Sequence, residues 1–205
     1  MLAFLYNSVR NKLLLITGFG TVLVIAVTLW SIYAGWVNNQ KLRHVIDEDL
    51  SVKSELQDLS FMFSGQVQNW KNVLLRGHIR DDRDKYWKRL EDNHTQIHAQ
   101  ATGVVDELNN VHGDVETANM VKEFVDLHHV MLATYKEALD VFVGQEFDYK
   151  AGDRIARGID QKPAKQLRMV IEKMDAESTR AMSEALADYK NGQMMALMAL
   201  GVADR

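Results

Sequence analysis

The sequence predicts an all-α protein, in which an N-terminal transmembrane helix precedes an antiparallel up-down-up-down four-helix bundle. Three observations support this fold class. A single proline, Pro163, in 205 residues leaves almost nothing to interrupt helices. The stretch from Leu13 to Gln40 carries no charged residue. Beyond it, apolar residues recur at steps of three and four, which is the period of an α-helix packed along one face.

The composition and the absence of known motifs exclude several classes of function. The net charge is −4, from 24 basic and 28 acidic residues, so the chain lacks the basic excess typical of nucleic-acid binders. It contains no cysteine, which excludes disulfides and thiolate metal sites. No G-x-S-x-G, glycine-rich phosphate loop or H-E-x-x-H occurs. We therefore expect no enzyme activity, no cofactor and no nucleic-acid partner.

The first element is a predicted transmembrane helix over residues 13–37, because about 20 apolar residues cross a bilayer core. Two basic residues precede it and three aromatic residues gather near its far end: Arg10 and Lys12, then Trp30, Tyr33 and Trp36. This pattern indicates a cytoplasmic N-terminus over residues 1–12 and an outer aromatic belt. The alternative is a cleaved signal peptide, but the run is long for one and no A-x-A-like site follows it.

Four helical stretches follow the predicted span. The first, from Leu42 to Arg76, carries an apolar seam and ends at Gly77, as helices often end at glycine: Val52, Leu56, Leu59, Phe63, Gln66, Trp70 and Val73. The second starts with Asp81 as a candidate N-cap and its seam continues to Val111. The third runs from 114 to 144. The fourth has a short lead-in over 147–157 and then runs from 160 to 193, with Pro163 in its first turn, where proline is tolerated.

Seams of this spacing are typical of helices packed at shallow angles, as in bundles. We therefore assign residues 38–193 to one four-helix domain, which the aromatic residues at the far end of the predicted span place on the outer side of the membrane. Residues 194–205 begin with a short apolar stretch, which we interpret as the start of a truncated second transmembrane helix. The alternative is an apolar helix end at the membrane interface.

Three short stretches of the sequence resemble segments of a known protein family. They are QVQNWKNVLLRG at 66–77, DKYW at 84–87 and RGIDQKP at 157–163. With the order of the helices, they resemble the ligand-binding half of bacterial methyl-accepting chemotaxis proteins. The resemblance implies a periplasmic sensor of a small-molecule ligand, in the bacterial inner membrane, acting in chemotaxis signal transduction as a homodimer. Such receptors continue into a long cytoplasmic hairpin. Alternatives are the sensor region of a membrane histidine kinase or cyclase, a structural coiled coil without a ligand, and a metal- or haem-binding bundle.

In that family, ligands enter the membrane-distal part of the bundle. The candidate ligand-binding residues here lie on the first and fourth helical stretches: Asn69, Asn72, Arg76, Arg157, Lys165 and Arg168. Asn69, Asn72 and Arg76 share one helix stripe, and Arg76 is suited to bind a carboxylate with two hydrogen bonds. The alternative is an ordinary solvated helix face. Gln66 and Asn93 occupy seam positions, where they either fix the helix register or line an internal polar pocket.

Four histidines form a second candidate site. His94 and His98 share a helix face at i and i+4, and His128 and His129 fall at a similar height on the next helix. Clustered imidazoles suit zinc, copper or haem iron, so these four are candidate metal ligands. The alternative is that they are ordinary surface and core histidines.

Overall fold

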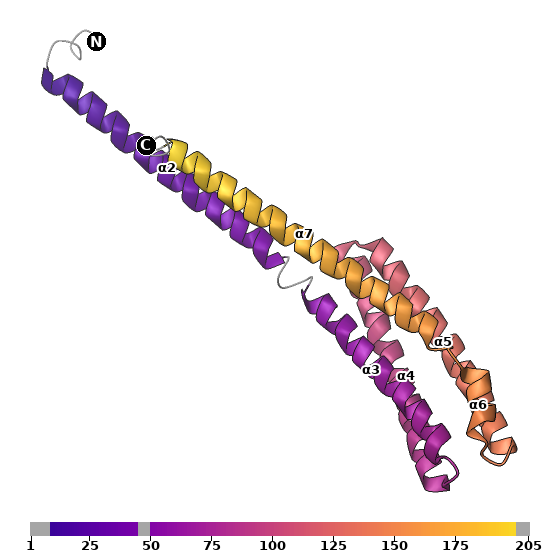
Figure 1. Ribbon diagram of the computed structural model, residues 1–205. Helices are drawn as coiled ribbons and strands as arrows, with labels where there is room; N and C mark the ends of the chain where they lie inside the picture. Colours follow the sequence, from indigo (N-terminus) through magenta and orange to yellow (C-terminus); the bar gives the residue numbers. More distant parts are fainter. Residues whose placement is uncertain (1–8, 45–49, 200–205) are drawn as a thin grey trace. The chain divides into compact units, whose positions relative to one another are not determined.

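The computed structural model describes residues 9–44 and 50–199, and every regular element in these two ranges is helical (Figure 1). The elements in chain order are α2 (Val9–His44), α3 (Leu50–Arg76), α4 (Arg80–Glu107), the π-helix η2 (Leu108–His112), α5 (Val115–Gly144), α6 (Tyr149–Ala156) and α7 (Gln161–Ala199). The all-α prediction is confirmed for this part of the chain.

The chain divides into two compact units. Unit 1 comprises Met1–Asp47 and Thr179–Arg205, and unit 2 comprises Glu48–Ser178. Helix α7 contributes residues to both units.

Unit 1 contains one helix, among the described residues, that is long and apolar enough to cross a membrane. This stretch, Val9–Val37, contains an 18-residue segment with a mean hydropathy of 2.3. None of the residues in that segment is buried. It includes the predicted span 13–37. Of the predicted second span at 194–205, α7 accounts for residues up to Ala199, and residues 200–205 lie outside the described residues, as do residues 1–8 of the predicted cytoplasmic segment.

Unit 2 is built around one hydrophobic core to which α3, α4, α5, α6 and α7 all contribute. Every seam residue expected on α3, including the polar Gln66, is buried. The predicted start of this helix at Leu42 is wrong: α2 continues to His44 and α3 begins at Leu50. The difference is consistent with the seam, whose first buried position is Val52.

Helices α3 and α4 run antiparallel, because side chains of one bond to the backbone of the other in reverse order. Gln66 Nε2 donates to the carbonyl of Leu90 at 3.3 Å, and Asn93 Nδ2 donates to that of Met62 at 3.3 Å. Figure 1 shows the two helices side by side. These bonds tie both polar seam residues across the helix pair, which favours the register interpretation over an internal polar pocket.

The turn between α3 and α4 depends on a glycine. A side-chain carbon on Gly77 would lie 2.8 Å from the Phe142 ring, closer than atoms pack. The N-cap of α4 is Ile79, which makes no side-chain capping bond, so the prediction of Asp81 as N-cap is wrong. Asp81 lies instead in the first turn, where its carboxylate is favourable toward the positive end of the helix dipole.

The end of α4 also departs from the sequence pattern. The helix widens into η2, and Gly113 then adopts a left-handed conformation with φ 68°. Because a π-turn shifts the angular position of later residues, Val111 leaves the core and is 64% exposed, contrary to the predicted seam. The later helices match closely: α5 ends at Gly144, α6 lies inside the predicted lead-in, and α7 starts at Gln161.

Candidate functional site

Unit 2 has a groove between α3 and α7. Its volume is about 380 Å³, within the range of small-molecule pockets. The residues that line it come from one stripe of each helix: Ser60, Phe63, Ser64, Val67, Gln68 and Lys71 of α3, and Ala164, Leu167, Arg168 and Ile171 of α7, with Asp160 just before α7. Apolar side chains form part of the lining, and hydroxyl, amide and charged groups complete it.

The charged residues of the groove come from both of its sides. Lys71 and Arg168 are exposed, and neither forms an ion pair within the described residues. Asp160 is half-buried and provides the one carboxylate of the lining. Two cations without acidic partners and a single carboxylate make this groove suited to a small solute that carries an anionic group.

Only some of the predicted ligand-binding residues lie at the groove. Arg168 lines the groove, whereas Lys165 is exposed and does not. Asn69 and Asn72 are half-buried on α3 and lie outside the lining. The structure thus brings one of the predicted cations to the groove.

The two remaining candidates already have partners. Arg76 Nη1 donates to the Tyr86 hydroxyl at 3.1 Å, and Arg157 Nη2 donates to Asp153 Oδ2 at 2.7 Å. Lys85 and Arg89 also lie over the Tyr86 ring, at 5.5 and 5.9 Å from its centre. Arg76 therefore belongs to a cation-rich contact around Tyr86, away from the groove lining.

Sequence reasoning missed most of the groove. Ser60, Ser64 and Lys71 recur at helical spacing on α3, beside the buried seam, and this spacing was the available signal. It is weak, because a solvated helix face has the same pattern.

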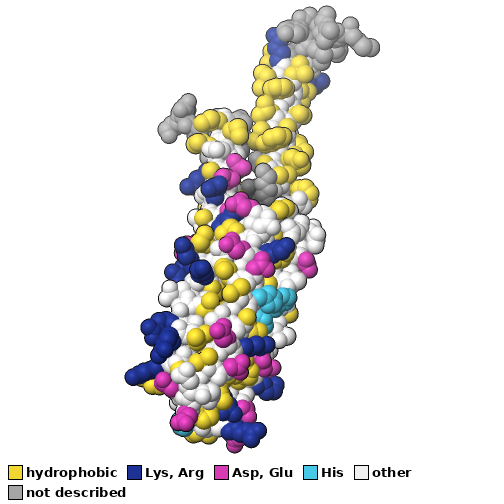
Figure 2. Space-filling view, turned by 90° about the vertical axis from the view of Figure 1, so that its right-hand side faces the viewer, with side chains coloured by type: hydrophobic (Ala, Val, Ile, Leu, Met, Phe, Trp, Pro, Cys, Tyr) yellow, Lys and Arg dark blue, Asp and Glu magenta, His cyan; other side chains and the backbone are white. Residues whose placement is uncertain are grey.

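The four histidines do come together between α4 and α5, as their heights predicted. The ring centres of His94 and His128 are 4.4 Å apart and stacked, those of His94 and His129 are 5.2 Å apart, and those of His98 and His129 are 4.8 Å apart. His94 and His128 are buried, His98 is half-buried and His129 is exposed. Figure 2 shows a compact patch of histidine side chains on one face of the molecule.

His128 is held by a buried hydrogen-bond chain. Its Nε2 lies 2.6 Å from Gln66 Oε1, and the Gln66 amide donates onward to the carbonyl of Leu90. The Gln66 oxygen accepts, so the proton of neutral His128 resides on Nε2. Burial, and then the positive charge that His94, His129 and His98 can carry, lower the pKa of His128 to about 3.

His94 is buried beside the other three histidines. Burial lowers its pKa to about 4, and the positive charges of His129, His98 and Lys136 act in the same direction. Its Nδ1 atom is buried without a hydrogen-bond partner. Among the described residues no group of three or more potential ligands is arranged to hold a metal ion, so the metal interpretation stays a prediction.

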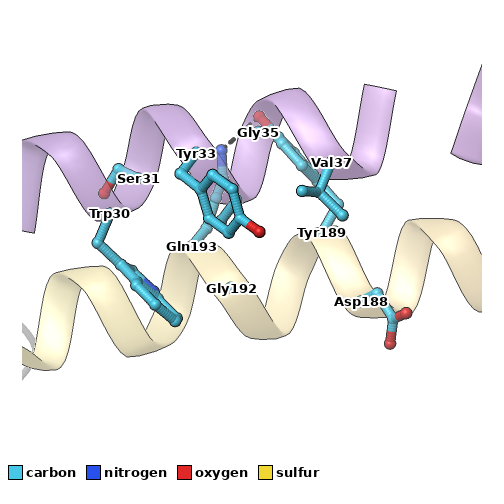
Figure 3. Close-up of a pocket in the computed structure, with 10 residues that line it drawn as sticks. Trp30, Ser31, Tyr33, Gly35, Val37, Asp188, Tyr189, Gly192 and Gln193 are labelled. Atoms are coloured by element: carbon cyan, nitrogen blue, oxygen red, sulfur yellow. Dashed lines mark hydrogen bonds between the residues drawn. The ribbon is translucent and has the colours of Figure 1, made fainter. Parts of the chain in front are cut away.

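Unit 1 contains a hollow of its own, of about 330 Å³, between α2 and the last turns of α7. Trp30 and Tyr33 reach from α2 toward α7, while Asp188 points away from α2 (Figure 3). Gln193 Nε2 donates to the Tyr189 hydroxyl at 2.6 Å. The lining is mostly apolar and includes the end of the stretch Val9–Val37 that is long enough to span a membrane.

Comparison with known proteins gives one informative similarity. No family model matches the sequence, and no solved structure matches it. The methyl-accepting chemotaxis protein CtpH of Pseudomonas aeruginosa is 26% identical over 201 residues, which are 96% of this chain and 34% of CtpH. The chain therefore spans about a third of the length of this homologue. This similarity agrees with the resemblance that the sequence shows.

Proposed function

We propose that the chain is the ligand-sensing region of a transmembrane chemoreceptor and not an enzyme. In this proposal α2 anchors the chain in the bacterial inner membrane, and unit 2 is an antiparallel four-helix bundle of α3, α4, α5 and α7 in the periplasm. The active form is a homodimer. The similarity to CtpH along nearly the whole chain supports this class of function.

The observation that carries the proposal is the groove between α3 and α7. A small solute with an anionic group binds there, between Lys71 on one wall and Arg168 on the other. Asp160 favours solutes that also present a hydrogen-bond donor or a cationic group. The apolar lining from Phe63, Leu167 and Ile171 holds the remainder of the molecule.

The position of the groove suggests how binding is reported. Because the two walls belong to different helices, a solute that bridges them changes the placement of α7 relative to α3. Helix shifts of about 1–2 Å are a known way to transmit a signal. Helix α7 runs without interruption from Gln161 to Ala199, so a displacement at Arg168 can propagate along it.

The test uses the full chain in lipid nanodiscs and a thermal-shift screen of small anionic and zwitterionic metabolites. A ligand of the folded state raises the melting temperature by mass action. We expect at least one solute to do so in the wild type and in Lys165→Ala, an exposed control one turn from Arg168. Lys71→Ala and Arg168→Ala should each abolish the shift at the same solute concentration. The proposal fails if no solute stabilises the wild type, or if the groove variants respond as the wild type does.

A further inference from the structure

The proposed sensing function leaves the histidine cluster between α4 and α5 without a role. None of its four residues lines the groove between α3 and α7. The cluster combines a buried imidazole nitrogen without a partner and two imidazoles that reach solvent. It therefore requires its own explanation.

Two ring-centre distances in the cluster, both measured from His129, match those of imidazoles around one metal ion. With a metal–nitrogen bond of about 2.1 Å, each ring centre lies roughly 3.2 Å from the ion, and tetrahedral ligands then place ring centres about 5 Å apart. The ring centres of His129 are 5.2 Å from His94 and 4.8 Å from His98. The ring planes are inclined by 66° and 58°, so these rings do not stack face to face.

The positions of His94, His98 and His129 on the backbone also allow the three side chains to bind one ion. His94 and His98 are one helical turn apart on α4, a spacing that lets two side chains share a ligand. His129 approaches both of them from α5. His128 is left out of this arrangement because its ring stacks on that of His94, with ring centres 4.4 Å apart. It serves to hold His94 in place.

The Nδ1 atom of His94 has no hydrogen-bond partner within the protein and is therefore available to bind an ion. A buried polar nitrogen without a hydrogen bond costs free energy that a bound ion would recover. The His94 side chain is only 8% exposed, so its unpaired nitrogen is screened from water.

We propose that His94, His98 and His129 form a site for a transition-metal dication such as Zn²⁺, Co²⁺ or Ni²⁺. The ring centre of His129 already lies at a suitable distance from those of His94 and His98. Rotation of the rings about their Cβ–Cγ bonds directs one nitrogen of each toward the ion, and such terminal torsions are broad and easily changed. In the present rotamers the described side chains do not yet converge on an ion. His98 and His129 give the ion access from solvent, and water or a solute completes the coordination.

Occupation of the site joins α4 to α5. The ion would bridge one helical turn of α4 to a single residue of α5, near the height of the Gln66–His128 bond. Binding would therefore stiffen the contact between α4 and α5. The proposal is independent of the ligand proposed for that groove.

The test uses the full chain without a polyhistidine tag, in nanodiscs, titrated with Co²⁺ and followed by visible absorption. We expect one Co²⁺ per chain, a d–d spectrum typical of nitrogen coordination, and displacement by Zn²⁺. His98→Gln and His129→Gln change surface-accessible residues and should leave the fold intact. Loss of a residue that only hydrogen-bonds to a metal ligand lowers metal affinity by about 10–100-fold. Loss of a ligand itself should therefore lower the Co²⁺ affinity of each variant by at least about tenfold.

His78→Gln is the matched control, because His78 is exposed on the α3–α4 turn outside the cluster. It should bind Co²⁺ as the wild type does. Absence of a stoichiometric Co²⁺ site in the wild type overturns the proposal. So does undiminished binding by the His98→Gln/His129→Gln double variant, which would place the ion elsewhere.

Discussion

At the scale of single residues, the centre of unit 2 depends on polar groups that satisfy one another. Gln66 is fully buried, accepts from His128 and donates to the carbonyl of Leu90. One side chain thus connects α3 to both α4 and α5. Such a residue specifies which helix faces meet, because a shift in register would leave its buried groups unpaired.

Replacement of Gln66 by leucine should therefore destabilise the fold although leucine fills a similar volume. The substitution leaves the Nε2–H of His128 buried without an acceptor, which costs about 1–3 kcal/mol. Chemical denaturation of the wild type and variant measures the difference in unfolding free energy. Gln68→Leu, an exposed position on the same helix, should change stability by less than about 0.5 kcal/mol. Equal stability of Gln66→Leu and the wild type would contradict the role given to Gln66.

The two buried histidines predict acid sensitivity. In the folded chain the pKa is about 4 for His94 and about 3 for His128, whereas an unfolded histidine titrates near 6.5. Below about pH 6.5 the unfolded chain binds protons that the folded chain does not, so stability falls as the pH decreases toward 4. Melting temperatures between pH 7.5 and 4.5 should show this loss, and His94→Gln should reduce it. His78→Gln should leave the pH profile unchanged, and a melting temperature independent of pH would refute the prediction.

At the scale of elements, helix ends in unit 2 depend on specific side chains. The α5 N-cap Asp114 accepts a bond from the backbone N–H of Thr117 at 3.0 Å, and Lys173 of α7 lies 3.6 Å from its carboxylate. Lys173 also donates to Thr117 Oγ1 at 2.8 Å. One cap therefore both starts α5 and fixes α7 beside it.

Asp114→Ala should lower the unfolding free energy by about 1 kcal/mol, the usual value of an N-cap. Asp114→Asn separates the two roles of the residue, because asparagine caps a helix equally well but carries no charge. We expect it to retain most of the stability, since a partly exposed ion pair adds little. Thermal unfolding monitored by circular dichroism provides the comparison, and equal losses in both variants would assign the effect to the ion pair.

At the scale of the whole molecule, sequence patterns predicted the elements better than the site. The α3 seam was predictable because each of its positions faces the same core, and local spacing alone determines that. The exposure of Val111 was not, because a π-turn changes the helical phase without a marked sequence signal. The histidine cluster was predictable, because the number of residues between each histidine and the nearest helix turn places all four at similar heights on neighbouring helices. The groove was not predictable, because it depends on how α3 and α7 pack against each other. The spacing of residues within one helix does not show which of its polar faces will line a groove.

The orientation of the chain in the membrane is the remaining prediction, and the sequence offers a clean way to measure it. The chain contains no cysteine, so an introduced one is a unique label site. If unit 2 is periplasmic, Lys165→Cys should react with a membrane-impermeant maleimide in cells whose outer membrane alone is permeabilised. Lys12→Cys, at the other end of the stretch Val9–Val37, should react only after the inner membrane is lysed. The positive-inside tendency of basic flanks and the aromatic residues at the far end of the span both favour this result. The reverse pattern would place unit 2 in the cytosol and exclude sensing of external solutes, whereas labelling of both sites in intact cells would show that α2 does not span the membrane.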